Sequence, residues 1–222
     1  MILSEFQEIL ESGKVRCNLC PRKCELLDAQ RGSCFVRRNE DGVIVSTTYG
    51  RSSGFCIDPI EKKPLYHFYP GSPILSFGTA GCNLACKYCQ NWDMSKAGNL
   101  DILQSEASPE KIIQMAKANN SESIAFTYND PIIFYEYAID TAIAAREAGL
   151  NSVAVTSAYI NKKPAKKFFD VMDAVNVDLK SFSKKFYKKF CGGKLKPVLE
   201  ILKFIKHETN TWLEVTTLII PG

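Results

Sequence analysis

Three cysteines lie at the spacing C-x3-C-x2-C: Cys82, Cys86 and Cys89. They follow directly on residues 74–78, an apolar run that predicts a strand, so one loop at the carboxyl end of that strand would carry three thiolates. Thiolates are the ligands of iron–sulfur clusters, and three of them leave one iron of a four-iron cluster without a protein ligand. The alternatives are a zinc site with a fourth ligand from elsewhere and three buried thiols that bind nothing.

A second group of cysteines stands near the start of the chain, at the spacing C-x2-C-x3-C-x9-C: Cys17, Cys20, Cys24 and Cys34. Zinc takes four thiolates in a tetrahedron and would stabilise a module too small to hold itself together. A second iron–sulfur cluster would use the same four ligands. The pattern leaves zinc, a cluster and the absence of any metal open.

The composition is that of a globular chain of 222 residues, with 45% hydrophobic residues and a net charge of +4 that neither requires nor excludes nucleic acid. No run approaches the roughly 20 apolar residues of a membrane span, and residues 1–11 lack a secretory signal, which predicts a cytoplasmic protein without a membrane partner. In that reducing compartment nine cysteines favour metal ligation over disulfides. Of the remaining two, Cys56 is expected to pack and Cys191 to lie on an exposed loop.

The elements that must position these cysteines are strands alternating with amphipathic helices. Strands are predicted at residues 74–78, 123–128, 152–157, 174–179 and 212–219. Ser108 followed by Pro109 predicts the start of one helix. A second helix is expected from near Pro131 to Gly149, and a third over residues 195–207. This order predicts an α/β fold with a parallel sheet that forms a partial (β/α) barrel, with reactive residues at the carboxyl ends of its strands.

The chain divides into two parts by pattern. Residues 1–71 are rich in cysteine and turn residues without long helical periodicity, which predicts an N-terminal cysteine-rich metal-binding module. Residues 72–222 carry the strand–helix alternation of the partial barrel. The chain stops at Gly222 without the helix expected next, so the barrel is expected to be incomplete after the fifth strand and the chain to be truncated at its C-terminus.

Polar residues follow the later strands. Asn129 and Asp130 come after the second strand and Ser157 after the third, and the last strand but one ends at Asp178 and Lys180. Residues two apart on a strand share a face, so Asp178 and Lys180 can both point into the mouth of the barrel. The simpler interpretations are a turn and helix cap at Asn129 and Asp130 and an ion pair between Asp178 and Lys180.

At its three closely spaced cysteines the chain resembles the radical S-adenosylmethionine (SAM) superfamily, whose C-x3-C-x2-C signature has an aromatic residue before the last cysteine, here Tyr88. The resemblance implies that Cys82, Cys86 and Cys89 hold a catalytic 4Fe–4S cluster and that SAM chelates the open iron. It places Tyr88 near the adenine of SAM. It further implies reductive cleavage of SAM to a 5′-deoxyadenosyl radical that abstracts hydrogen from a substrate, with an electron donor such as flavodoxin or ferredoxin.

The resemblance also assigns cofactor-binding roles to the polar strand ends. Residues 127–130 stand where many members carry Gly-Gly-Glu, and their acceptors on Asn129 and Asp130 would receive the methionine ammonium of SAM. The Asp178-x-Lys180 pair resembles the Asp-x-Lys of activating enzymes, in which Lys180 would meet the SAM carboxylate and Asp178 a ribose hydroxyl or a cation. Ser157 would complete the pocket.

A narrower resemblance rests on residues 58–72 and 90–92, which are similar to the radical SAM component of the AmmeMemoRadiSam system, a relative of pyruvate formate-lyase activating enzymes. It implies activation of a glycyl radical in a protein substrate as one outcome, and a modified small molecule or RNA as substrate fits equally well. The competing hypothesis is a cysteine-rich zinc-binding module that contacts nucleic acid and uses the strand–helix part as a scaffold.

Overall fold

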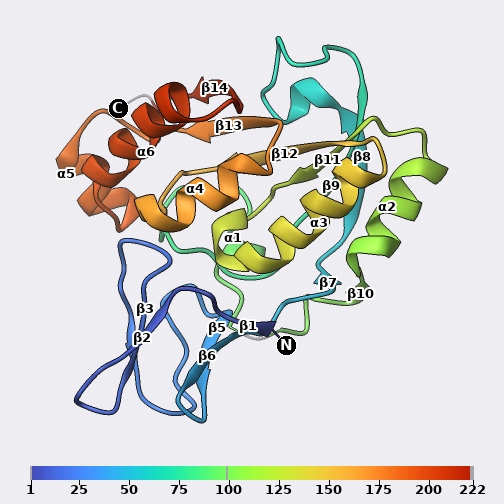
Figure 1. Ribbon diagram of the computed structural model, residues 1–222. Coiled ribbons are helices and arrows are strands. Elements are labelled where there is room, and N and C mark those ends of the chain that lie inside the picture. Colours follow the sequence, from blue (N-terminus) through green and yellow to red (C-terminus); the bar gives the residue numbers. More distant parts are fainter. Residues whose placement is uncertain (1, 99, 221–222) are drawn as a thin grey trace.

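The computed structural model describes residues 2–98 and 100–220 and is built around a six-stranded sheet (Figure 1). The strands are β8 (Phe55–Pro59), β9 (Pro73–Phe77), β11 (Ser123–Phe126), β12 (Asn151–Thr156), β13 (Ala174–Asp178) and β14 (Trp212–Thr216), in the order β14-β13-β12-β11-β9-β8. The strands β9, β11, β12, β13 and β14 are parallel, which confirms the five predicted strands and the parallel sheet. The edge strand β8 was not expected and pairs antiparallel with β9.

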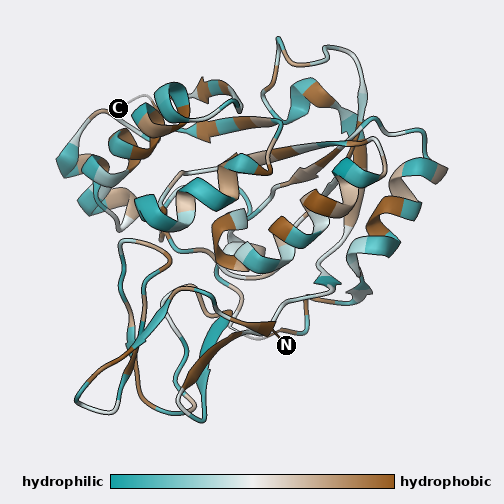
Figure 2. Cartoon of the chain, viewed as in Figure 1, coloured by the Kyte–Doolittle hydropathy of each residue, from teal (hydrophilic) through white to brown (hydrophobic). Residues whose placement is uncertain are grey.

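Helices cover the outer face of this sheet. They are α2 (Pro109–Ala118), α3 (Tyr135–Glu147), α4 (Lys162–Asp170) and α6 (Leu195–Glu208), and the short 3-10 helix η2 (Pro131–Phe134) leads into α3. The Ser108 hydroxyl caps α2 by accepting from Lys111 N at 3.3 Å, as expected. Gly149 takes a φ of +77° just after α3, a conformation that costs glycine little. Figure 2 shows hydrophilic and hydrophobic bands alternating along these helices, which is the pattern of helices packed on one side.

The inner face of the sheet is covered by the segment between β8 and β9, which includes the 3-10 helix η1 (Ile60–Lys62). Ile60 and Leu65 are fully buried there against inward-facing residues of four strands. On β14, Glu214 accepts hydrogen bonds from the backbone N–H groups of Tyr66 and His67, at 2.9 and 3.0 Å. The segment that carries the narrower resemblance therefore closes the amino-terminal end of the inner face and leaves the carboxyl end open.

The N-terminal part forms small antiparallel sheets that lie below the main sheet in Figure 1. One joins β1 (Ile2–Leu3), β6 (Val43–Ser46) and β5 (Arg37–Glu40), another joins β2 (Gln7–Ile9), β3 (Val15–Cys17) and β4 (Glu25–Leu26), and β7 (Arg51–Ser52) pairs with β10 (Ser105–Glu106). A buried ion pair of 2.6 Å between Arg37 and Glu136 ties these sheets to α3. Because β8 lies within residues 1–71 yet belongs to the main sheet, the two parts interlock at this edge.

Three short helices complete the chain: α1 (Trp92–Ser95), α5 (Lys184–Phe186) and the π-helix η3 (Tyr187–Cys191). None of the helices in the described part of the chain is long and apolar enough to cross a membrane.

Candidate active site

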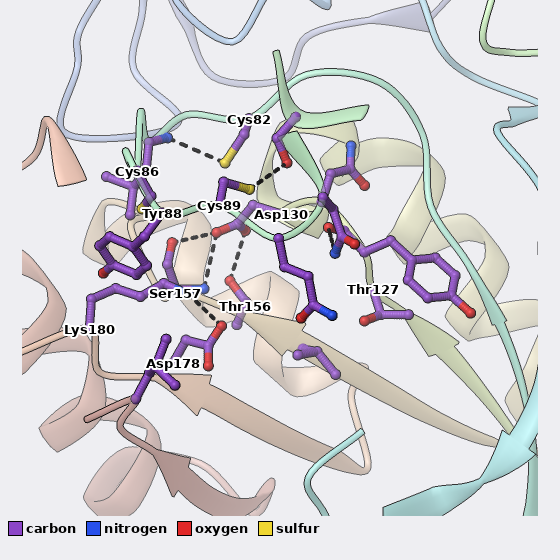
Figure 3. Close-up of a pocket in the computed structure, with 18 of the residues that line it drawn as sticks. Cys82, Cys86, Tyr88, Cys89, Thr127, Asp130, Thr156, Ser157, Asp178 and Lys180 are labelled. Carbon is purple, nitrogen blue, oxygen red and sulfur yellow. Dashed lines mark hydrogen bonds and ion pairs between the residues drawn. The ribbon is translucent and has the colours of Figure 1, made fainter. Parts of the chain in front are cut away.

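A cavity of about 320 Å³ opens at the carboxyl ends of the parallel strands (Figure 3). All nine residues expected at a catalytic or cofactor site line it: Cys82, Cys86, Tyr88, Cys89, Asn129, Asp130, Ser157, Asp178 and Lys180. They come from the loop after β9 and from the ends of β11, β12 and β13, because parallel strands bring their carboxyl ends to one edge. Figure 3 shows the cysteines on one side of the cavity and the Asp178–Lys180 pair on the other.

The cysteine loop presents three thiols to this cavity. Burial raises the pKa of the Cys82 thiol to about 12, and its sulfur accepts from Leu84 N at 3.4 Å. Cys89 contacts the Ser95 hydroxyl at 3.5 Å. Among the described residues, no group of three Cys, His, Asp or Glu side chains is arranged to hold a single metal ion. Three thiols on one loop beside open space fit a cluster with a vacant iron.

Asn129 holds this loop in place from the end of β11. Its Oδ1 accepts from Thr79 N at 3.1 Å, and its Nδ2 donates to Thr79 Oγ1 and to the carbonyl oxygen of Gly81, both at 3.0 Å. Gly81 also donates its N–H to Met94 O at 2.8 Å. The residue directly before Cys82 is therefore fixed from both sides.

Asp130 is buried, and four donors surround its carboxylate. Oδ1 accepts from Thr156 Oγ1 at 2.8 Å and from Ile132 N at 3.2 Å, while Oδ2 accepts from the Ser157 N–H at 3.0 Å and from the Ser157 hydroxyl. A carboxylate offers about four acceptor positions, so this one is saturated by the protein. The acceptors expected to be free on Asp130 are thus already used, and Asn129 Oδ1 already accepts one hydrogen bond. The cap on η2 expected as the simpler interpretation is present.

Asp178 and Lys180 form the expected ion pair, of 2.6 Å, and also take the expected place in the cavity wall. Burial alone would lower the pKa of Lys180, but the charge of Asp178 and its hydrogen bond outweigh burial and raise that pKa above the usual value for lysine. The site therefore keeps a positive charge facing the cysteines at neutral pH.

Comparison with known proteins identifies the family. Residues 77–222 match the Radical SAM superfamily, which is more than half of the chain. The chain belongs to the radical SAM superfamily. Members of this superfamily are enzymes that use a 4Fe–4S cluster and SAM, and they need a reductant and a substrate.

One relative in sequence and two solved structures resemble the chain. The uncharacterized protein MJ0808 of Methanocaldococcus jannaschii is 43% identical over 217 residues, which covers 98% of this chain and 64% of that protein, so the chain spans less than two thirds of its relative. The structure of TYW1 with a lysine–pyruvate adduct bound shares the fold, with a TM-score of 0.51 and 16% identity over 67% of this chain and 56% of that chain. The structure of Streptococcus suis SuiB bound to precursor peptide SuiA also shares the fold, with a TM-score of 0.51 and 15% identity over 67% of this chain and 33% of that chain.

The expectations for both lone cysteines were wrong. Cys56, expected to pack, is exposed on β8. Cys191, expected on an exposed loop, has a side chain that is fully buried at the end of the π-helix η3. Its sulfur lies 3.3 Å from Tyr88 Oη, and a hydrogen bond from Cys86 contributes most to lowering its pKa to about 7. The backbone of the cysteine loop also bonds to the end of the π-helix, because Ala85 N donates to Cys191 O at 2.9 Å. Phe186 and Phe190 stand four apart among lysines and so indicate a helix with one buried face just before Cys191. The loop that buries Cys191 lies about a hundred residues earlier in the chain, so the sequence did not identify it.

Other cavity residues were missed by sequence reasoning. Asn91 lines the cavity and donates to Tyr128 O at 2.8 Å, and Lys96 adds a second cation to the wall. On β14, Thr216 also lines the cavity, whereas Glu214 binds the segment between β8 and β9. These residues follow no spacing rule, so the tertiary structure was needed to find them.

The four N-terminal cysteines (Cys17, Cys20, Cys24 and Cys34) line a second, smaller cavity. Burial raises the pKa of the Cys17 thiol to about 11 and that of Cys20 to about 12. Asn83 of the cysteine loop also lines this cavity, so the two cysteine sites of the chain lie on either side of one loop.

Proposed function

We propose that Cys82, Cys86 and Cys89 ligate the 4Fe–4S cluster of this enzyme and that SAM occupies the 320 Å³ cavity beside them. Bound there, the cluster would pass one electron from an external reductant to SAM, which would cleave to methionine and a 5′-deoxyadenosyl radical able to abstract hydrogen from the substrate. The observation that carries the proposal is that nine residues chosen from four separate strand ends line one cavity. The open sheet then acts as a partial barrel, with the inner segment closing its far end.

The charged side chains divide the binding of SAM between them. Lys180, whose positive charge Asp178 preserves, would meet the SAM carboxylate, and Asp178 could also accept from a ribose hydroxyl. The saturated Asp130 carboxylate would attract the SAM ammonium by charge while holding Ser157 in place. Tyr88, fixed by its contact with Cys191, would form the wall beside the adenine.

The finer assignment is an activating enzyme of the AmmeMemoRadiSam type, with a flavodoxin or ferredoxin as electron donor and a protein glycyl radical as one product. Its support is the segment between β8 and β9, whose residues carry the narrower resemblance and form the inner floor below the cavity. The competing zinc module that binds nucleic acid does not account for the cavity at the strand ends.

Electron paramagnetic resonance tests the proposal. The wild type, reconstituted anaerobically with iron and sulfide and reduced with dithionite, should give a cluster signal that SAM perturbs, and it should release 5′-deoxyadenosine. Cys86→Ala should lose the SAM-sensitive signal. Cys56→Ala is the matched control, because this thiol is exposed and outside the cavity, and it should behave like the wild type. A wild-type cluster indifferent to SAM would refute the proposal.

A further inference from the structure

The N-terminal cysteines meet through a tight turn between β3 and β4. The Cys17 N–H donates to Cys24 O at 2.8 Å, and Lys23 takes a left-handed φ of 48° to make the turn. Cys34 reaches the same cavity from the loop after β4, where Ser33 N donates to the Cys24 sulfur at 3.4 Å. Four thiols from two short loops thus surround one space.

An unpaired donor in the wall of this cavity points to a bound anionic centre. Arg37 lines the cavity, and its two Nη atoms are used by Glu136 and Ser4. Its Nε is buried and, within the described chain, has no hydrogen-bond partner. The guanidinium lies close enough to Cys17 and Cys34 to interact with both electrostatically. An unmet buried donor destabilises the fold, and a thiolate or bridging sulfide would satisfy it.

The arrangement of the four thiols distinguishes a single zinc ion from a cluster. Zinc holds each sulfur at about 2.3 Å, so four ligands must converge on one point. In residues 2–98 and 100–220, no group of three cysteine, histidine or acidic side chains is arranged to hold a single metal ion, although all four N-terminal thiols line one cavity. The same holds for the three cysteines proposed to hold the superfamily's cluster, which line their own cavity. A cubane takes its ligands at separated corners, which suits both sets.

We infer that Cys17, Cys20, Cys24 and Cys34 hold a second 4Fe–4S cluster, ligated by four thiolates, rather than a zinc ion. This site lies outside residues 77–222, which match the superfamily, and it does not depend on how SAM is bound. It adjoins the first site, because Arg22 Nε donates to Asn83 O at 2.8 Å and both residues line the second cavity. With four protein ligands, its irons would offer no position to SAM.

Metal analysis of two complementary variants tests this inference. Both are reconstituted anaerobically with iron and sulfide in the presence of equimolar zinc. Cys82→Ala/Cys86→Ala/Cys89→Ala should retain about four irons and four sulfides per chain, with a reduced-cluster signal that SAM does not perturb. Cys20→Ala/Cys24→Ala should lose about half of the wild-type iron and keep the SAM-sensitive signal. Cys56→Ala, with an exposed thiol outside both cavities, should retain the full iron content.

Zinc without iron in the triple variant would overturn the inference, as would full iron content in the Cys20→Ala/Cys24→Ala variant or a chain that binds no metal at the second cavity. If the triple variant does not fold by circular dichroism, Mössbauer spectroscopy of the wild type decides, because about eight irons in two cluster environments are expected. Loss of the SAM response with both clusters present would count against the proposed function and leave this inference intact.

Discussion

The side-chain amide of Asn129 donates a hydrogen bond of 3.0 Å to the carbonyl oxygen of Gly81, the residue directly before the first cysteine of the cavity. The same amide accepts from the Thr79 backbone, so the end of β11 holds the loop after β9 through a single side chain. The role of Asn129 is therefore to position the cysteines, and its effects should differ from those of a residue that only contacts SAM.

Removing this amide tests that role. Asn129→Ala leaves buried backbone groups at Thr79 and Gly81 without partners, so we expect unfolding free energy to fall by about 1–3 kcal/mol and the reconstituted cluster to be lost faster in air. Urea denaturation and the decay of visible absorbance measure the two effects. Asn119→Ala is the control, because that amide bonds only at an exposed helix end. Equal effects of the two variants would contradict the positioning role.

Gly81 is where the N-terminal sheets touch the cysteine loop. Its φ is +84°, and a Cβ added there would overlap the carbonyl oxygen of Cys34. Gly13 has a similar φ of +75° but nothing within 4 Å of an added Cβ. We expect Gly13→Ala to cost about 1–2 kcal/mol from backbone conformation alone and Gly81→Ala to cost clearly more, because only the latter also displaces the docked loop. Matching unfolding free energies in the two variants would argue against this close docking.

Lys180 should set the affinity for SAM without making it pH dependent near neutrality. Its raised pKa means that the charge, and any stability it contributes, is complete below the unfolded-state pKa of about 10.4 and is lost only as pH rises through the higher folded value. Lys180→Met should weaken SAM binding by about 10- to 100-fold, the loss of one charged hydrogen bond. Isothermal titration from pH 7 to 9 checks both points, with the exposed Lys188→Met as control. Because the amine of SAM itself titrates in this range, the pH profiles of wild type and Lys180→Met are compared, and a wild-type affinity that falls more steeply than that of the variant would contradict the assignment.

Two properties of Cys191 act in opposite directions on its reactivity with alkylating reagents. Its lowered pKa, about 7, would favour alkylation, but its side chain, at the end of the π-helix, is buried against the cysteine loop. Because a reagent must reach the sulfur before ionisation matters, we expect iodoacetamide to label the exposed Cys56 first and Cys191 only after unfolding. Peptide mass spectrometry under native and denaturing conditions measures the order, and rapid native labelling of Cys191 would show that the π-helix is not docked.

Local pattern in the sequence determined much of this protein. The C-x3-C-x2-C spacing and the apolar strand runs could be read directly, because side chains alternate along a strand and the carboxyl ends of parallel strands share one edge. Together with the resemblance to the superfamily, those two facts predicted the cysteine loop and nine site residues, all of which line the cavity.

Contacts between distant segments were decided only by the tertiary structure. The cap residues Ser108 and Asp130 could be predicted, but the saturation of Asp130 depends on Ser157 and Thr156 from another strand. The antiparallel strand β8, the burial of Cys191 beside Tyr88 and the meeting of the N-terminal cysteines with the cysteine loop likewise join segments far apart in the chain. Periodicity records which face of an element is buried, but not which distant element covers it.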